Sequence, residues 1–213
     1  MLKSLFGSGA GRAGAAAPGA HAYPLKLNLG CGYRKMDGYL NVDRSGDSQP
    51  DLVMDLESLP WPFPDNSVTH ISMSHVLEHI GQEADKFLQL IQEMYRVCAP
   101  QAELTVAVPH PRHDNFLSDP THVRPILPTT LQLFDQAMNR EAIATGNGAS
   151  PLGLQLGVDF EIRSVQFILD PRWAGRFEAG ELTSEQVFEY AQSQNNVIAE
   201  LTLILVAHKP GRG

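Results

Sequence analysis

The sequence LKLNLGCG, residues 25–32, places three leucines directly before a turn that contains two glycines. A short apolar run that ends in closely spaced glycines is typical of a buried parallel strand that opens into a ligand-binding turn. A second apolar run, LNVD at residues 40–43, ends in Asp43. A carboxylate at the tip of the neighbouring strand is the group that accepts hydrogen bonds from ribose hydroxyls. The two runs therefore predict a parallel sheet with an adenosine-binding site at its edge.

The glycine spacing separates this turn from two common nucleotide-binding motifs. A dinucleotide fingerprint needs a third glycine three residues after the second, and an acidic residue about twenty residues further on. This chain has Lys35 at the first of these positions, and Asp43 comes too early for the second. A phosphate-binding loop is also missing, because no Lys-Ser or Lys-Thr pair follows a glycine run. We therefore expect an adenosine-containing ligand without phosphates.

Four sequence blocks follow one another as LNLGCG (residues 27–32), NVD (41–43), DLVMDLESLPWPFPDNSVTHI (51–71) and SHVLEHI (74–80). In this order and spacing they resemble the class I S-adenosylmethionine-dependent methyltransferases, especially the small methyltransferase type 11 group. The resemblance covers roughly residues 25–110. One departure is visible, because a short connection at residues 33–39 replaces the full helix that usually precedes the second strand.

The resemblance implies a Rossmann-like, doubly wound α/β fold with a seven-stranded, mostly parallel sheet and an antiparallel hairpin at its edge. It implies S-adenosyl-L-methionine as the cofactor, with Asp55 accepting a hydrogen bond from the adenine amino group and Leu56 packing near the ring. Because open α/β sheets bind ligands beyond the carboxyl ends of their strands, His75 should wall the same pocket. The residues expected to bind the cofactor are Gly30, Cys31, Gly32, Asp43, Asp55, Leu56 and His75.

Hydrophobic periodicity and turn residues predict the remaining elements. We expect a helix over residues 87–98, with an apolar stripe that faces the sheet, and further helices that begin near Thr129 and Thr183. The first of these two should carry Leu131, Phe134 and Met138 on one face. The expected strands are at residues 25–29, 40–43, 51–56, 68–73, 104–108, 160–169 and 197–207.

The segments between these elements suggest one domain over residues 23–213, preceded by a flexible Gly- and Ala-rich tail at residues 1–22. Alternate prolines should hold residues 59–65 extended, with their aromatic rings packed. A Gly-rich, polar stretch at residues 145–157 is typical of a mobile insertion. The segment at residues 171–177 has two open interpretations: a lid over the substrate, or packing of Trp173 under the following helix.

The loop after the fifth long strand, residues 109–125, is the most polar segment and is stiffened by prolines. Its histidines, carboxylates and arginines suggest side chains held for chemistry, and we interpret it as a catalytic loop. His110 is expected as the base or acceptor anchor because it is nearest the strand end. Aspartates would orient an imidazole, and Arg124 would hold the acceptor. The expected catalytic residues are His110, His113, Asp114, Asp119, His122 and Arg124.

Two alternatives of another class remain open at this point. The chain could be a non-catalytic S-adenosylmethionine-binding subunit, although the histidines, carboxylates and arginines of the loop at residues 109–125 argue against that interpretation. It could also be a metal-dependent hydrolase, although the glycine turn and Asp43 argue against this second interpretation. A divalent metal held by the same loop could also serve a methyltransferase by acidifying an acceptor hydroxyl. The candidate ligands are His110, His113, Asp114, Asp119 and His122.

The amino-acid composition indicates which class of methyl acceptor and which cellular compartment to expect. The 213 residues include 24 Asp and Glu against 16 Lys and Arg, a net charge of −8 that disfavours a nucleic-acid partner. No run of about eighteen apolar residues predicts a membrane span. Only two cysteines are present, which fits a cytoplasmic protein without disulfides. We expect a small-molecule acceptor, with O-methylation of a sugar or another hydroxylated metabolite.

Overall fold

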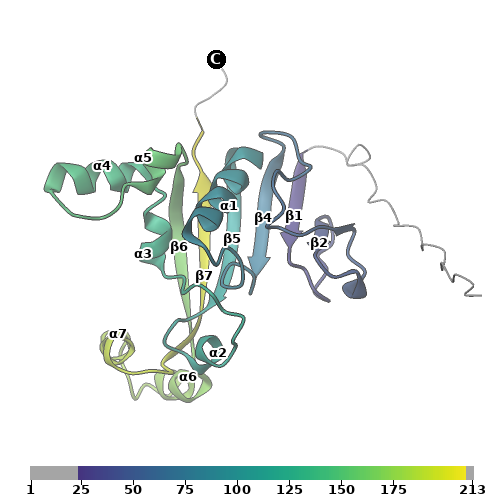
Figure 1. Cartoon of the computed structure of the whole chain (residues 1–213). Coiled ribbons are helices and arrows are strands. Elements are labelled where there is room, and N and C mark those ends of the chain that lie inside the picture. The colour runs from purple at the N-terminus through teal and green to yellow at the C-terminus, as the bar shows by residue number, and fades with distance from the viewer. Residues whose placement is uncertain (1–23, 210–213) are drawn as a thin grey trace, which may run out of the picture.

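The computed structural model describes residues 24–209 and folds them around one seven-stranded sheet (Figure 1). The tail predicted at residues 1–22 lies outside the described residues. The strands, in chain order, are β1 (Leu25–Leu29), β2 (Leu40–Asp43), β3 (Leu52–Val53), β4 (Val68–Ser74), β5 (Cys98–Pro109), β6 (Phe160–Leu169) and β7 (Ile198–Ala207). The helices are α1 (Ala84–Val97), α2 (Asp114–Leu117), α3 (Pro128–Gln132), α4 (Gln136–Thr145), α5 (Leu152–Leu156), α6 (Pro171–Glu178), α7 (Ser184–Ser193) and the 3-10 helix η2 (Gly46–Ser48).

The sheet has the strand order β3-β2-β1-β4-β5-β7-β6. The five neighbouring strands β3, β2, β1, β4 and β5 run parallel to one another. Strand β1 is the middle one, and its Leu27 pairs with Leu40 of β2 on one side and with Ile71 of β4 on the other. Strand β7 is antiparallel to both β5 and β6. This arrangement confirms the predicted Rossmann-like fold with a mostly parallel sheet and an antiparallel edge hairpin.

The central strands form because their side chains are buried on both faces of the sheet. Leu27 and Leu29 of β1, Val42 of β2 and Leu201 of β7 have no exposed surface. Parallel strands covered on both faces need such near-continuous apolar runs, whereas in the edge strand β6 every residue after Phe160 is exposed or half-buried. The aromatic rings of the proline-rich segment at residues 59–65 also pack into the core, as predicted, with Trp61 and Phe63 both buried.

Helix α1 carries the predicted apolar stripe, but its boundary with β5 differs from the prediction. Phe87, Ile91 and Met94 are buried against the sheet. The helix passes directly into a strand of twelve residues, where a loop before residues 104–108 was expected. Pairing with the chain before β4 begins at once, because the Ser67 amide donates to the carbonyl of Val97, the last helical residue. Cys98 is therefore the first residue of the strand rather than the end of the helix.

Strand β3 is shorter than the predicted strand at residues 51–56. Its two residues pair with β2, and the Met54 amide still donates to the Asp43 carbonyl. The chain then turns, because the Asp55 side chain accepts from the Glu57 amide and the Asp55 carbonyl accepts from the Ser58 amide. Asp55 therefore lies in a turn at the sheet edge and not in a strand.

The helix predicted to begin near Thr129 is two helices, and the predicted mobile insertion is partly helical. Asp135 interrupts the first helix because its carboxylate accepts from the amides of Ala137 and Met138 and so begins α4. Within residues 145–157, α5 packs closely enough that a Cβ added at Gly153 would lie 2.8 Å from the Phe134 carbonyl oxygen. A glycine is required at this contact, which joins α5 to the end of α3.

The connection between β1 and β2 contains turns and no helix, as the short spacing predicted. Two buried asparagines hold it in place of a helix. Asn28 donates to the Asn41 side chain at 2.9 Å and to the Arg34 carbonyl, and the Asn41 oxygen accepts from the Met36 amide. Since buried amides are stable only when hydrogen-bonded, this pair ties the connection to the two strands.

Helices α2, α6 and α7 gather beyond the carboxyl ends of the parallel strands, at the bottom of Figure 1. Residues on and around α6 and α7 form a small second apolar cluster that includes Leu182, Val187 and Val197. The Trp173 ring lies 4.9 Å from the ring of Tyr190 on α7. Of the two interpretations of residues 171–177, packing of Trp173 against the following helix is therefore the contact that the structure contains.

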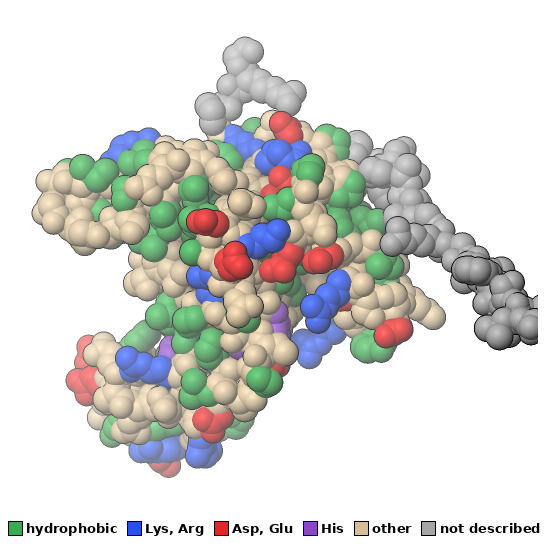
Figure 2. Space-filling view, in the orientation of Figure 1, with side chains coloured by type: hydrophobic (Ala, Val, Ile, Leu, Met, Phe, Trp, Pro, Cys, Tyr) green, Lys and Arg blue, Asp and Glu red, His purple; other side chains and the backbone are tan. Residues whose placement is uncertain are grey.

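Figure 2 shows acidic and basic side chains interspersed over the visible face, and histidine side chains where the lobe of α6 and α7 joins the body. No helix within residues 24–209 has the length and apolar character required to cross a membrane.

Candidate active site

The glycine turn after β1 is held by contacts that explain its glycines. Gly30 and Gly32 have φ angles of +66° and +47°, which disfavour other residues. A Cβ at Gly30 would also lie 2.4 Å from a methyl group of Val76. Between them, the Cys31 amide donates to the Val42 carbonyl, and burial, followed by the nearby Asp43, raises the pKa of its thiol. Cys31 is therefore a buried structural residue of the turn.

Asp43 connects the end of β2 to this turn. Its Oδ2 accepts from the Gly32 amide at 2.8 Å, and its Oδ1 accepts from the Ser45 amide at 2.9 Å. A carboxylate offers about four lone-pair positions, so each oxygen can accept a further hydrogen bond. The carboxylate is thus fixed in direction and still able to bind hydroxyl groups.

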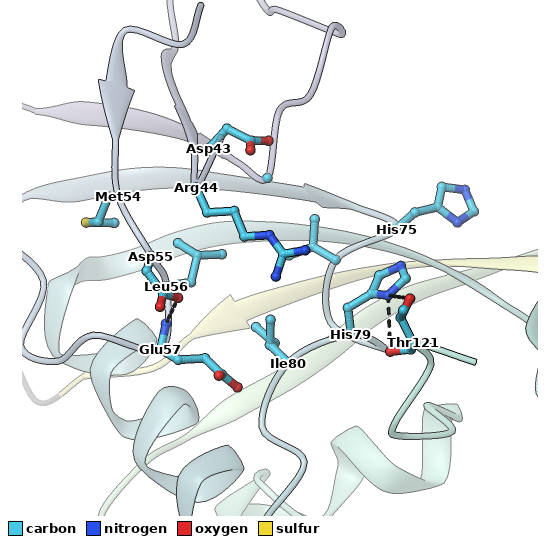
Figure 3. Close-up of a pocket in the computed structure, with 12 residues that line it drawn as sticks. Asp43, Arg44, Met54, Asp55, Leu56, Glu57, His75, His79, Ile80 and Thr121 are labelled. Atoms are coloured by element: carbon cyan, nitrogen blue, oxygen red, sulfur yellow. Dashed lines mark hydrogen bonds between the residues drawn. The ribbon is translucent and has the colours of Figure 1, made fainter. Parts of the chain in front are cut away.

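A cavity of about 290 Å³ opens at the carboxyl ends of β1, β2 and β4 (Figure 3). This volume is near the lower end of the roughly 300–1,000 Å³ that is usual for ligand sites, and it suits one nucleoside-sized ligand. Five of the expected cofactor-binding residues line it, whereas Cys31 and Gly32 do not. The lining residues are Gly30, Asp43, Arg44, Met54, Asp55, Leu56, Glu57, His75, Val76, His79, Ile80 and Thr121.

The wall opposite Asp43 comes from the turn that follows β3. Leu56 is buried, and Asp55 is exposed beside it with its Oδ1 on the Glu57 amide. Glu57 in turn accepts from the Gly81 amide at 2.6 Å and joins this turn to the segment after β4. The side chain of Arg44 extends into the middle of the view in Figure 3.

His75 is the first residue after β4 and has a φ of +56°, an uncommon conformation that is often found at functional sites. Its ring points away from the other labelled residues in Figure 3. Its Nε2 lies 2.9 Å from Glu200 and its Nδ1 lies 3.5 Å from Glu78. The interaction with Glu78, followed by that with Glu200, raises the pKa of His75 despite its partial burial. The His75 ring thus faces two carboxylates, and the residue is also part of the cavity wall.

His110 lies at the end of β5, outside the lining of the cavity. Its Nδ1 accepts a hydrogen bond from the Arg112 amide at 3.2 Å, so the neutral ring carries its proton on Nε2. Burial, then the charges of Arg112 and His113, lower the pKa of His110. The neutral ring can therefore donate a hydrogen bond from Nε2, whereas its Nδ1 is occupied by the Arg112 amide.

His113 and Asp114 have contacts with the lobe of α6 and α7. The buried His113 ring caps α2, because its Nδ1 accepts from the Asn115 amide, and its Nε2 lies 3.3 Å from Asp170. The Asp114 amide donates to the side chain of Asn196, and its own carboxylate is exposed. Neither residue lines the cavity.

The end of the same loop returns to the cavity through Thr121. The Thr121 hydroxyl donates to Asp119 at 2.6 Å and lies 3.0 Å from Nδ1 of His79. The hydrogen bonds from Thr121 lower the pKa of Asp119. The His122 ring lies next to that of His79, with 4.5 Å between the ring centroids. Asp119 thus contacts His79 through Thr121, and its Oδ2 lies 3.8 Å from Nε2 of His122.

The Arg124 side chain makes its contacts with other residues of the protein. Its guanidinium lies 4.2 Å from the centre of the Phe87 ring and donates to the Gly81 carbonyl at 2.6 Å. Burial lowers its pKa. These contacts attach the end of the loop to the beginning of α1.

The six loop residues expected to act together are therefore dispersed. Within residues 24–209, the side chains close enough to share a metal ion are Glu78, His79 and His122, and not the predicted set from the loop alone. Sequence reasoning missed His79, Arg44 and Thr121 in the cavity wall. Arg44 directly follows Asp43, which is a signal that could have identified it. His79 had no such local signal, because its partner Thr121 is 42 residues away in the sequence.

Comparison with known families agrees with this geometry. Residues 7–106 match the family model described as a methyltransferase domain, of the type 11 group. No curated protein matches the sequence significantly. The family match supports methyl transfer over the alternatives of a hydrolase or a non-catalytic subunit.

Two solved structures resemble the chain in fold. A SAM-dependent methyltransferase from Archaeoglobus fulgidus is 17% identical, with a TM-score of 0.56 over 85% of this chain and 86% of that chain. The YcgJ protein from Bacillus subtilis is 16% identical, with a TM-score of 0.50 over 91% of this chain and 96% of that chain. The likeness to these two structures supports the same fold, and the match to the methyltransferase domain model of the type 11 group covers residues 7–106 of the chain.

Proposed function

We propose that the chain transfers the methyl group of S-adenosylmethionine to a hydroxyl of a small polar acceptor, such as a sugar or another hydroxylated metabolite. The observation that carries this proposal is the cavity bounded by Gly30, Asp43 and Asp55 at the carboxyl edge of the sheet. When bound, the cofactor supplies a methyl group that its sulfonium has already activated. The protein must then hold the donor, orient the acceptor and provide for its proton.

The residues of the cavity fit an adenosine group. The Asp43 oxygens each retain a lone pair for a ribose hydroxyl, because each accepts one backbone hydrogen bond. The exposed carboxylate of Asp55 can accept from the adenine amino group, and the buried Leu56 offers an apolar surface for the ring. Gly30 provides backbone approach, while Cys31 and Gly32 maintain the turn behind it.

The roles that we propose for the histidines in acceptor binding depend on whether Nε2 of each ring carries a proton or a lone pair. His110 serves as an anchor that donates from Nε2 to an acceptor oxygen, since its Nδ1 is occupied by the Arg112 amide. The proton of the acceptor hydroxyl passes to Nε2 of His79, which carries the lone pair because Nδ1 donates to Thr121. His113, Asp114 and Arg124 shape the loop through their contacts with α2, Asn196 and Phe87.

Two further parts of the proposal rest on composition. The net charge of −8 supports a small molecule over a nucleic acid as acceptor. Both cysteines are buried free thiols, which supports a cytoplasmic location with a reducing environment.

The donor site is tested by calorimetric titration of S-adenosylmethionine, NAD and ATP into the protein and into two variants. S-Adenosylmethionine alone should bind, and Asp43→Ala should weaken its binding by about 5- to 150-fold, equivalent to about 1–3 kcal/mol. Asp47→Ala is the matched control, because this exposed carboxylate lies outside the cavity. No heat with the parent protein, or equal affinity in Asp43→Ala, would contradict the proposed site.

The acceptor atom is tested separately with a donor carrying a ¹³C-labelled methyl group and a mixture of small hydroxylated metabolites. The carbon chemical shift of the transferred methyl group distinguishes products methylated on oxygen, nitrogen or carbon. We expect an O-methyl signal. A product labelled on nitrogen or carbon would overturn the acceptor class and leave the donor site intact.

A further inference from the structure

Three metal-ligating side chains meet beside the cavity. One ligand atom each from Glu78, His79 and His122 lies within 4.8 Å of the other two. Glu78 and His79 follow β4, whereas His122 comes from the loop after β5. His79 lines the cavity, so the cluster borders the space proposed for the ligand. The proposed methyl transfer does not use this cluster as a unit.

Glu78 is the most unusual member of the cluster. Its side chain is fully buried, and neither carboxylate oxygen has a hydrogen-bond partner among the described residues. The ring of His75 lies 3.5 Å from Oε1, but its other nitrogen is at 2.9 Å from the competing carboxylate of Glu200. A buried carboxylate is costly unless a cation or several hydrogen bonds compensate it. Apart from this ion pair with His75, which Glu200 shares, Glu78 has no cation or hydrogen-bond donor among the described residues to offset its burial.

The two histidines present the nitrogen that a metal needs. The Nδ1 of His122 lies 2.8 Å from the Phe116 carbonyl oxygen, which can only accept, so Nδ1 carries the proton and Nε2 the lone pair. The Nδ1 of His79 faces the carbonyl and hydroxyl oxygens of Thr121 at 3.3 and 3.0 Å. Because the hydroxyl already donates to Asp119, it accepts from His79. Metal-binding histidines are oriented by such hydrogen bonds from the second nitrogen to a carbonyl or hydroxyl.

We propose that Glu78, His79 and His122 bind one divalent transition-metal ion of the zinc, cobalt or manganese type. Two imidazoles and one carboxylate are a common ligand set for such ions, whereas magnesium and calcium prefer oxygen ligands alone. Bonds of about 2.0–2.1 Å would bring the ligand atoms to about 3.3 Å from one another, a closure of on the order of 1 Å per side chain. Three protein ligands leave a position for an oxygen of the acceptor, on the side of His79 that faces the cavity.

Binding of the ion depends on these three side chains alone, but its use for the acceptor rests on the proposed function. A metal-bound hydroxyl loses its proton more readily than a free one. With the ion bound, Nε2 of His79 is a ligand, and the proton of the metal-bound hydroxyl would pass to solvent water instead. Donor binding does not involve Glu78 or His122, since neither lines the cavity.

The test uses the full chain without an affinity tag, treated with a chelator and then titrated with Zn²⁺, Co²⁺ or Mg²⁺. Calorimetry should detect one Zn²⁺ or Co²⁺ per chain, Co²⁺ should acquire visible absorption bands, and Mg²⁺ should not compete. His79→Asn and His122→Asn retain a donor near Nδ1 and delete Nε2, so each should weaken Zn²⁺ by at least about 100-fold. Loss of a ligand should exceed the ~10–100-fold effect that is usual for an orienting residue.

Matched variants separate the site from adventitious binding and from unfolding. Thr121→Val removes the hydroxyl that orients His79 and should weaken Zn²⁺ by about 10-fold or more. His208→Asn alters an exposed histidine that pairs with Glu161 and should leave Zn²⁺ affinity unchanged. Thermal melting should show that His122→Asn is folded, and it should bind S-adenosylmethionine like the parent protein. A parent protein without stoichiometric metal, or Asn variants that bind Zn²⁺ like the parent, would overturn the metal site and leave donor binding untouched.

Discussion

Four histidines in the segments after β4 and β5 form two pairs, and their surroundings leave Nε2 with a lone pair in one pair and with a proton in the other. In His79 and His122, Nδ1 faces oxygens of Thr121 and Phe116 and donates to them. In His110 and His113, Nδ1 accepts from backbone amides two residues further along the chain. A neutral imidazole has one proton and one lone pair to offer. The first pair therefore has a lone pair on Nε2, and the second pair can only donate from Nε2.

The contrast teaches that the position of a histidine in a loop does not determine its chemistry. His110 and His113 are closed off by turns of their own backbone, which use the lone pair to stabilise local structure. His79 instead depends on Thr121, 42 residues away, and this contact forms only in the folded protein. The tertiary structure thus selects which tautomer His79 adopts.

The largest expected effect comes from removing a free Nε2. Once an acceptor is known, His79→Asn should lower turnover by about 100-fold or more, since the variant keeps a donor to Thr121 but loses the lone pair. His110→Gln keeps a donor near Nε2 and should change turnover only a few-fold. Initial rates at saturating donor measure both. Equal losses in the two variants would remove the distinction between the pairs.

The second effect concerns stability. His113→Ala should lower the free energy of unfolding by about 0.5–2 kcal/mol, because α2 loses its N-terminal cap. The contact between His113 and Asp170 would be lost as well. Urea denaturation measures the change, and His113→Asn, whose side-chain oxygen can accept from the same amide, should recover part of it. A variant as stable as the parent protein, or one with weakened donor binding, would mean that His113 is not a structural residue.

The smallest effect is a pH dependence of stability due to His75. The carboxylates of Glu78 and Glu200 raise the pKa of His75 in the folded state. Its stabilising contribution is therefore complete below the unfolded pKa of about 6.5 and is lost as the pH rises through the folded value. Denaturation from about pH 6 to about pH 9 should show a smaller decline in His75→Gln than in the parent protein. Parallel curves would show that the carboxylates do not couple to the ring.

The part of the cavity wall that we propose binds the donor could be predicted from sequence because its signals are local. Gly30, Asp43 and Asp55 each lie at the end of an apolar run, and the sheet brings those ends to one edge. The break between α3 and α4 was also open to prediction, since Asp135 is a good N-cap residue, but the apolar spacing across it suggested a continuous helix.

The acceptor half could not be predicted in the same way. Its residues come from the loops after β4 and β5, and their spacing along the chain does not reveal which side chains meet. The burial of Glu78 without hydrogen-bond partners is a property of the packed structure and has no counterpart in the sequence. Arg124 illustrates the same limit, because its stacking on Phe87 depends on how the loop returns to α1.

The difference between the two histidine pairs is tested most directly by NMR of the metal-free protein labelled with ¹⁵N in its histidines. Long-range proton–nitrogen correlations near pH 8 report which ring nitrogen carries the proton, and single His→Gln variants assign the signals. We predict that His79 and His122 are protonated on Nδ1, and that His110 and His113 are protonated on Nε2. The same tautomer in all four rings, or His122 protonated on both nitrogens beside Asp119, would contradict the account.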